Sequence, residues 1–369
     1  MSNQPIGAGK KLTVAAVGDL MLGDSPIAAG YGFHSRYPGA AAREALEGLR
    51  PVLTGVDVVF GNLEAQLTRR GLGGTRLARN MMRGDPEYAE LLRDLGFDVL
   101  AVANNHAMQH GPEAFAESVS ALRTAGIAVA GLRGTAPWAA EPIYFTAHSG
   151  ATAGILAYSF RPRQYGTGDP CYATGSESAV LADVTRLRTQ VDHVIVSLHW
   201  GEEFTSQPST SEVLFAGQLV AAGTSLLLGH HPHVARPVVV GPQGCIAYSL
   251  GNAVSDMVWR DEFRHGLALR CRLGEPAPEV DVLSLVTDRR YRVHVGESFG
   301  PAAILGFVSG LKDSDYREAI DESMRRYRRS AFWHMVGNVW RSPPAITTEL
   351  FAEKARNLWA RVVPDRSPQ

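Results

Sequence analysis

Short hydrophobic runs alternate with amphipathic stretches from residue 12 to about residue 296. The runs are rich in β-branched and other apolar residues and predict buried strands, for example LTVAAVG (12–18), FDVLAVAN (97–104), HVIVSLHWG (193–201) and SLLLGHH (225–231). Helical spacing marks the stretches between them, such as PGAAAREALEGLRPVL (38–53), DPEYAELLRDLG (85–96) and PEAFAESVSALRTAG (112–126). This alternation predicts an α/β protein with a largely parallel sheet covered by helices.

The last part of the chain has a different pattern. Two long amphipathic segments with helical spacing, 306–342 and 345–363, contain most of the late aromatic residues. We therefore expect three parts: a flexible tail over 1–11, a catalytic domain over 12–296, and a mostly helical extension over 297–369 that packs on the core.

Composition narrows the classes of partner and compartment. Lysine and arginine (36) nearly balance aspartate and glutamate (37), which excludes the strongly basic surface of a nucleic-acid binder. Cys171, Cys245 and Cys271 are odd in number and widely spaced, which predicts no disulfide framework and favours a reducing cytosol. No apolar run approaches the roughly 20 residues of a membrane span. We expect a cytoplasmic protein with no nucleic-acid partner and no membrane span.

Polar side chains follow the predicted strands at the points where those strands end. In open α/β sheets, ligands bind beyond the carboxyl ends of the strands, so these side chains are expected to converge. The set comprises Gly18 and Asp19, Asn62 and Glu64, Asn104 to His106, His199, His230, His231, His233, and Asn252.

The histidines in this set indicate a metal site. His199, His231 and His233, with nearby carboxylates, supply the nitrogen and oxygen ligands that divalent metals prefer. Three buried imidazoles without partners would cost several kcal/mol, whereas a metal makes them bonding partners. We expect one or two divalent ions and no organic cofactor. The ligand types admit zinc, manganese, iron, cobalt, calcium or magnesium.

Six segments resemble, in order, the CapA family, which is named for capsular poly-gamma-glutamate synthesis and is similar to calcineurin-like metallophosphoesterases. The segments are VGDLMLGD, GNLEAQLT, ANNHAMQHG, SLHWGEE, GHHPHV and YSLGN, and the resemblance covers about residues 12–256. It implies a four-layer α/β/β/α sandwich of the metallo-dependent phosphatase type, with metal at the sheet ends. In this chain a C-terminal helical extension follows it.

The resemblance also implies a set of metal ligands, and this sequence departs from the family pattern at several positions. The implied metal ligands are Asp19, Glu64, Asn105, His199, His231 and His233. His106 would act as acid or electrostatic clamp. Met21 stands where the phosphoesterase pattern has a histidine, and Asn62 where it has a bridging aspartate, so Glu64 is the candidate replacement. Gln109 stands where relatives commonly carry an aspartate.

Several reactions suit such a site. A Lewis-acidic metal can activate water for hydrolysis of a phosphoester or an amide, or polarise a carbonyl so that a Cα proton is removed. Removal of a Cα proton is the first step of Cα epimerisation (L to D), a reaction that the resemblance implies for some members of the family. We favour this reaction, in the tailoring of peptide natural products. The alternatives are a metal-dependent hydrolase, a poly-gamma-glutamate assembly factor, and a non-catalytic binding module.

Candidate roles follow from position in the motifs. The catalytic candidates are Asp19, Glu64, His106 and Glu202, with His294 as a further proton-transfer candidate. Arginine-rich loops after the strand ends should rim the pocket and bind an anionic group on a peptide or peptide-like substrate. The predicted substrate-binding residues are Asn62, Asn104, His230, Asn252, Arg76, Arg83 and Arg161. The oligomeric state is left open.

Overall fold

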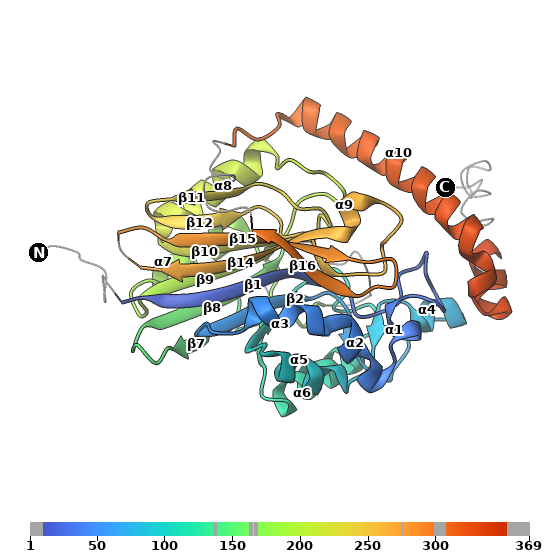
Figure 1. Ribbon diagram of the computed structural model, residues 1–369. Coiled ribbons are helices and arrows are strands. Elements are labelled where there is room, and N and C mark those ends of the chain that lie inside the picture. Colours follow the sequence, from blue (N-terminus) through green and yellow to red (C-terminus); the bar gives the residue numbers. More distant parts are fainter. Residues whose placement is uncertain are drawn as a thin grey trace, which may run out of the picture.

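Two β-sheets stacked face to face form the centre of the computed structural model, and helices cover their outer faces (Figure 1). The structure describes residues 10–135, 139–161, 165, 169–274, 276–298 and 308–352. The division at residues 296 and 297 stays a prediction, and residues 1–9 and 353–369 of the predicted end segments lie outside the described residues.

The first sheet combines a parallel half with an antiparallel half. Its strands, in spatial order, are β16 (Val293–Ser298), β15 (Glu279–Thr287), β14 (His265–Leu273), β1 (Leu12–Leu20), β2 (Val58–Leu63), β5 (Val99–Ala101) and β6 (Ala128–Ala130), and β13 (Asn252–Val254) also pairs with β1. Strands β1, β2, β5 and β6 run parallel, whereas β14, β15 and β16 are joined antiparallel. The prediction of a largely parallel sheet therefore holds for only one half of this sheet.

The second sheet is parallel in its interior and antiparallel at its edges. In spatial order its strands are β11 (Val238–Gly241), β12 (Gly244–Ala247), β10 (Thr224–His230), β9 (His193–His199), β8 (Thr152–Ser159) and β7 (Ile143–Thr146). The central strands β8, β9 and β10 are almost fully buried, which fits their continuous apolar runs. A small third sheet pairs β3 (Gln66–Leu67) with β4 (Arg83–Gly84).

Three hydrophobic cores separate the four layers. Val14 of β1, Ile155 of β8 and Leu226 of β10 belong to the core between the sheets. The next residues along β1 and β8, Ala15 and Leu156, belong to two other cores, each beneath outer helices. This alternation follows from the two-residue period of a strand and confirms the predicted α/β/β/α sandwich.

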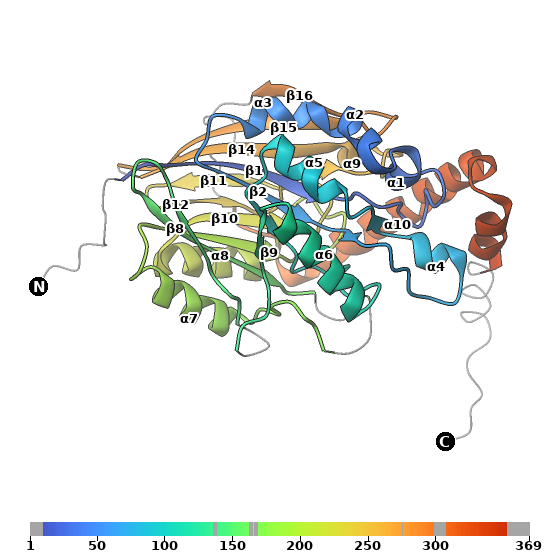
Figure 2. The same ribbon diagram turned by 90° about the horizontal axis from the view of Figure 1, so that it is seen from below.

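Outer helices lie on opposite sides of the paired sheets. Figure 2 shows α7 (Glu177–Leu187) and α8 (Thr210–Ala222) on one side, with α2 (Ala42–Leu46) and α3 (Arg50–Leu53) on the other. The remaining helices of this part are α1 (Phe33–Arg36), α4 (Arg76–Asn80), α5 (Tyr88–Leu95), α6 (Pro112–Thr124) and α9 (Asp261–Arg264). The start of α8 shows why it forms here, because Ser209 and Glu212 make a reciprocal capping box.

The stretch 38–53 is broken into short pieces instead of forming one helix. Two 3-10 turns, Gly39–Ala41 and Glu47–Leu49, alternate with α2 and α3. Gly48 explains one break, since a Cβ there would lie 1.9 Å from the carbonyl oxygen of Val293 in β16. Pro51 adds to the interruption because it has no backbone N–H to donate.

The predicted helical extension is present in α10 (Asp313–Asn338), which runs past α9 along one side of the molecule (Figure 1). Its buried residues Ala331 and Met335 pack in a small core with Ile27 and Leu77. Its opposite face leaves Trp333 exposed. Among the described residues, no helix is long and apolar enough to cross a membrane.

Asp256 and Asp24 form a buried acidic pair away from the histidines. Asp256 accepts a hydrogen bond from the backbone N–H of Ser25 at 2.8 Å through Oδ2, while its Oδ1 has no partner. Burial, and then the negative charge of Asp24, raises the pKa of Asp256 to about 7.

We expect Asp256→Asn to stabilise the protein above about pH 7 by roughly 2–4 kcal/mol and to have little effect near pH 4. Because the folded-state pKa is raised, protonated Asp256 makes its full contribution to the free energy of unfolding below the unfolded-state pKa. That contribution is lost as the pH rises through about 7. Urea denaturation at pH 4.5 and 8 would measure this, with exposed Asp321→Asn as the control. A pH-independent difference would contradict the assignment.

Candidate metal centre

The carboxyl ends of four strands, β1, β2, β9 and β10, deliver the polar residues to one place, and Asn252, the first residue of β13, joins them. Asp19 near the end of β1 lies in register with Asn62 of β2 and Asn252 of β13. His199 and His230, the last residues of β9 and β10, lie in register in the second sheet. The predicted convergence of these strand-end residues is thus seen in the register of both sheets.

Close backbone packing fixes the position of Asp19. A Cβ at Gly18 would lie 1.9 Å from the carbonyl oxygen of Gly251, so only glycine lets β1 approach this closely. The same carbonyl accepts a hydrogen bond from the backbone N–H of Asp19 at 2.9 Å.

The loop after β10 brings the imidazoles of His231 and His233 into the cluster. His231 has φ 97° and His233 has φ 59°, in the left-handed region that non-glycine residues seldom occupy. Such conformations cost about 1–3 kcal/mol each and persist where surrounding structure enforces them. Here the backbone N–H of His231 donates to Oδ2 of Asp19 at 3.2 Å, which ties the turn to β1.

Asp19 is held as a carboxylate. Asn62 donates to its Oδ1 at 2.8 Å, and Nδ1 of His230 lies 3.1 Å from the same oxygen. Burial acts to raise the pKa of Asp19, but the hydrogen bond and charge of His230, with smaller contributions from His233 and Asn62, bring it below its ordinary value.

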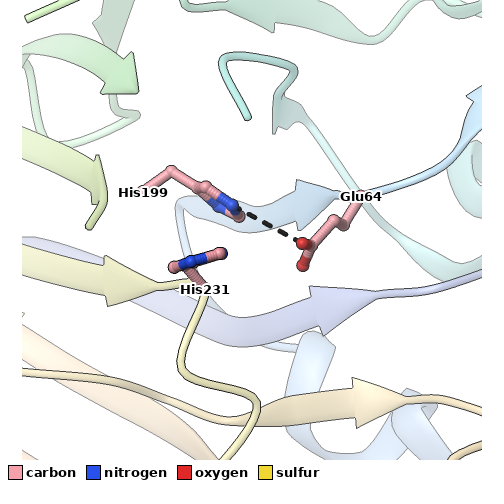
Figure 3. Close-up of side chains that lie close together, drawn as sticks. All are labelled: Glu64, His199 and His231. Atoms are coloured by element: carbon pink, nitrogen blue, oxygen red, sulfur yellow. Dashed lines mark ion pairs between the residues drawn. The ribbon is translucent and has the colours of Figure 1, made fainter. Parts of the chain in front are cut away.

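Glu64 is buried next to three imidazoles and bonded to none of them. Its Oε1 lies 3.5 Å from Nε2 of His199 and 3.8 Å from Nε2 of His233. Figure 3 shows the Glu64, His199 and His231 side chains pointing toward one another. Burial, followed by the charge of Asp19, raises the pKa of Glu64 well above its usual range.

The unpartnered atoms of this cluster fit a bound cation. Both carboxylate oxygens of Glu64 and both ring nitrogens of His231 are buried without a hydrogen-bond partner. A buried polar atom left in this way costs about 1–3 kcal/mol. Ligand atoms that lie 3–4 Å apart can surround an ion at about 2.0–2.2 Å from each.

Three overlapping groups of side chains place their ligand atoms within 4.8 Å of one another. They are Glu64, His199 and His231; Asp19, Glu64 and His233; and Glu203, His231 and His233. Glu64 belongs to two of the groups, so its two oxygens could serve two adjacent ions. The donor set of imidazoles and carboxylates fits one or two borderline divalent metals.

Asn105 completes the first of these groups from a neighbouring loop. Its Oδ1 lies 2.8 Å from Nε2 of His199. Burial, with further contributions from the neighbouring imidazoles, lowers the pKa of His199 well below its usual value, so the ring is neutral and can act as a ligand.

Four residues predicted to bind substrate contact the ligand candidates or the backbone beside them. Asn62 and His230 contact Asp19, and Oδ1 of Asn252 lies 3.0 Å from Nδ1 of His233. Asn104 donates to the carbonyl of Leu63 at 2.8 Å. The members of this set are at most 1% exposed: Asn62, Asn104, His230 and Asn252. A direct contact with substrate stays a prediction for them.

His106 lies at the open side of the cluster and is 7% exposed. Its Nδ1 lies 2.6 Å from Oε1 of Gln109, an acceptor, so Nδ1 carries the proton and Nε2 keeps its lone pair. Nε2 is 4.0 Å from Oε1 of Glu64, and the ring stacks on Tyr165. Burial lowers the pKa of His106 to about 4, so the ring is neutral at pH 7.

The structure distinguishes two adjacent glutamates in the loop after β9. Glu202 forms a two-fold ion pair with Arg161, at 2.6 and 3.0 Å, so each neutralises the other. The neighbouring Glu203 instead joins a group with His231 and His233. Sequence reasoning selected Glu202 for catalysis and missed Glu203 as a ligand candidate, because two adjacent carboxylates carry no signal of which one faces inward.

The remaining candidates have local contacts of their own. Arg83 donates to the backbone carbonyls of Thr68 and Arg69 and so braces the β3–β4 region. Arg76 is exposed on α4. His294 is exposed on β16 and lies 3.2 Å from a carboxylate oxygen of Asp288. Substrate binding by Arg76, Arg83 and Arg161 stays a prediction.

The model of the family described as "Bacterial capsule synthesis protein PGA_cap" matches residues 13–257, which include every ligand candidate described above. The chain belongs to this family. The predicted CapA resemblance is thereby confirmed.

Two curated relatives carry the family name. The chain is 27% identical to "Capsule biosynthesis protein CapA" of Bacillus anthracis, over 68% of this chain and 61% of that protein. It is 25% identical to "PGA biosynthesis protein CapA" of Bacillus subtilis, over 67% of this chain and 64% of that protein. The chain thus spans about three-fifths of the length of these relatives.

A solved structure of a 5'-nucleotidase from Candida albicans is also similar, with a TM-score of 0.38 and 10% identity. The similarity covers 89% of this chain and 58% of that one. Such a score carries no conclusion about activity. A cytoplasmic location for this chain stays a prediction.

We expect the purified protein to contain about one or more equivalents of divalent metal, and His231→Ala and Asp19→Ala to lower metal affinity at least about tenfold. Elemental analysis after dialysis would measure this. His294→Ala is the matched control, since it removes an exposed imidazole outside the cluster. Equal metal content in all four proteins would exclude the site.

We also expect added divalent metal to raise the melting temperature of chelator-treated protein. An ion at a hundredfold excess over its Kd stabilises the folded state by about 2.7 kcal/mol. Glu64→Gln should reduce this shift, because an amide is a weaker ligand than a carboxylate. Differential scanning fluorimetry with and without metal would show it. An unchanged shift in the variant would remove Glu64 from the ligand set.

Proposed function

We propose that this chain is a metal-dependent component of polyglutamate-type polymer synthesis that acts on an acidic, glutamate-rich peptide chain. The observation that carries the proposal is the buried set of unpartnered ligand atoms on Glu64 and His231. Most buried polar atoms have a bonding partner, and a divalent cation would supply one to these four ligand atoms together.

The substrate class is supported by the named relatives. The two Bacillus relatives are named for capsule and PGA biosynthesis. Both similarities extend over about two thirds of this chain. An acidic peptide chain as substrate also agrees with the anionic group that the sequence predicts.

The chain's own residues would divide the work as follows. The ligands for the ion or ions would be Asp19, Glu64, Asn105, His199, His231 and His233, with Glu203 beside them. When bound, the ion supplies Lewis acidity to a substrate carbonyl. Asn62 keeps Asp19 in place, and Asn252 keeps His233 in place. His106 can accept a proton at Nε2, which lies on the side of Glu64.

Amide hydrolysis is the reaction class that we propose for this centre. A neutral imidazole beside a Lewis-acidic ion suits proton removal from water. The sequence-based preference for Cα epimerisation has no support in the names of the relatives reported above. It also requires a second proton-transfer group on the opposite face of the Cα, whereas hydrolysis requires one group that removes a proton from water.

The test uses a γ-linked glutamate tetramer and metal-loaded protein in heavy water. After back-exchange into ordinary water, we expect mass spectrometry to find fragments whose summed mass exceeds that of the tetramer by one water molecule, without deuterium at Cα. His231→Ala should abolish the fragments, and His294→Ala should retain them. Deuterium at Cα without cleavage would replace hydrolysis by epimerisation. The absence of both cleavage and deuterium uptake would refute the proposed function.

A further inference from the structure

A pocket of about 440 Å³ lies next to the candidate metal centre, where α9 and α10 face the loops that follow β9 and β10. The residues that line it are Phe204, Ser206, Val234, Ala235, Arg260, Glu262, Phe263, His265, Ser323 and Arg326. Six of these come from residues 260–326, beyond the part of the chain that matches the family model.

The pocket shares its wall with the metal centre. Val234 directly follows the ligand candidate His233, and the ring of Phe204 lies 6.1 Å from the ring of His233. On the same wall the carbonyl of Phe263 accepts a hydrogen bond at 2.9 Å from Asn252, which in turn contacts His233. The pocket and the metal centre are therefore neighbours across this wall.

The helix α10 is fixed over this wall at several points along its length. Tyr316 places its hydroxyl 3.3 Å from the backbone N–H of Glu202 and 3.3 Å from Nη2 of Arg236. Further along, Tyr327 stacks on Phe204 with ring centroids 4.3 Å apart. Because these contacts hold the helix against the loops, the pocket is formed before any ligand enters.

The polar lining of the pocket favours an anion. Arg260 is already paired with Glu262, with Nε at 2.6 Å from Oε1, and its guanidinium lies over the ring of Phe263. Arg326 is exposed, and the ion pairs found among the described residues do not include it. Its guanidinium and the hydroxyls of Ser206 and Ser323 supply donors with which a carboxylate can bond.

We propose that this pocket is a second subsite that binds a side-chain carboxylate of the acidic peptide substrate while another part of the same chain lies at the metal centre. The identity of the substrate rests on the proposed function, whereas the affinity for an anion rests on the pocket itself. Phe204 and Phe263 give the aliphatic part of a glutamate side chain an apolar surface, and Arg326 pairs with its carboxylate.

The subsite assigns a role to the C-terminal helix. Without α10 the wall formed by Phe204 and Phe263 would be open to solvent, and the donor groups of Ser323 and Arg326 would be missing. In this chain α10 therefore contributes to substrate positioning as well as to packing.

The experiment titrates metal-loaded protein with the γ-linked glutamate tetramer by isothermal calorimetry. We expect Arg326→Ala to weaken binding about fivefold or more, the size of one partly exposed charge-assisted contact. Arg325→Ala is the matched control, because it removes the same charge from the next position of α10, outside the pocket lining. It should change binding less than twofold.

A second variant changes affinity in the opposite direction. Glu262→Gln removes the negative charge beside Arg260 and should tighten tetramer binding by about twofold to fivefold. Equal weakening in Arg326→Ala and Arg325→Ala would show diffuse attraction to the helix and overturn the subsite. Unchanged or weaker binding in Glu262→Gln would overturn it as well.

The two proposals fail separately. If the tetramer binds in an Arg326-dependent manner but is not cleaved, the hydrolytic function is wrong and the subsite stands. If wild-type protein cleaves the tetramer and Arg326→Ala binds it as tightly as wild type, the subsite is wrong and the function stands.

Discussion

The burial of Glu64 among buried imidazoles is the constraint on which the architecture of this protein depends. Its two oxygens and both ring nitrogens of His231 lie in the interior without a hydrogen-bond partner. In a metal-free interior each would carry a desolvation cost, and the negative charge of Asp19 nearby adds to it. A divalent cation turns these costs into bonds, so the site and the stability of the folded chain are linked through one interaction.

The surrounding fold holds these atoms in a rigid geometry. Asp19 and Glu64 come from the first sheet, while His199 and the loop with His231 come from the second, so the cluster connects the two sheets at their carboxyl ends. A layer of amide and imidazole groups around the cluster orients the ligands from behind. Support of this kind tunes a metal site as strongly as the ligands do.

Two regions of the chain contribute in different ways to function. The metal centre lies within residues 13–257, the part that matches the family model. The pocket beside it draws most of its lining from the segment around α9 and from α10. Most of the pocket lining therefore lies beyond the part that the family model matches, whereas the candidate metal centre lies within it. In the proposed function, the first region supplies the chemistry and the second positions the substrate.

The sequence by itself determined the alternation of buried strands with helices and the convergence of polar residues at the candidate metal centre, while the four layers were implied by the family resemblance. Runs such as 193–201 and 225–231 report burial through local periodicity, and polar residues at strand ends converge because parallel strands share one edge. Only the tertiary structure decided which partner each side chain meets. It paired Arg161 with Glu202, placed Glu203 rather than Glu202 among the ligand candidates, and added antiparallel strands to a parallel half-sheet. Periodicity records whether a residue is buried, whereas partners from distant segments depend on how those segments pack, and no local pattern encodes that.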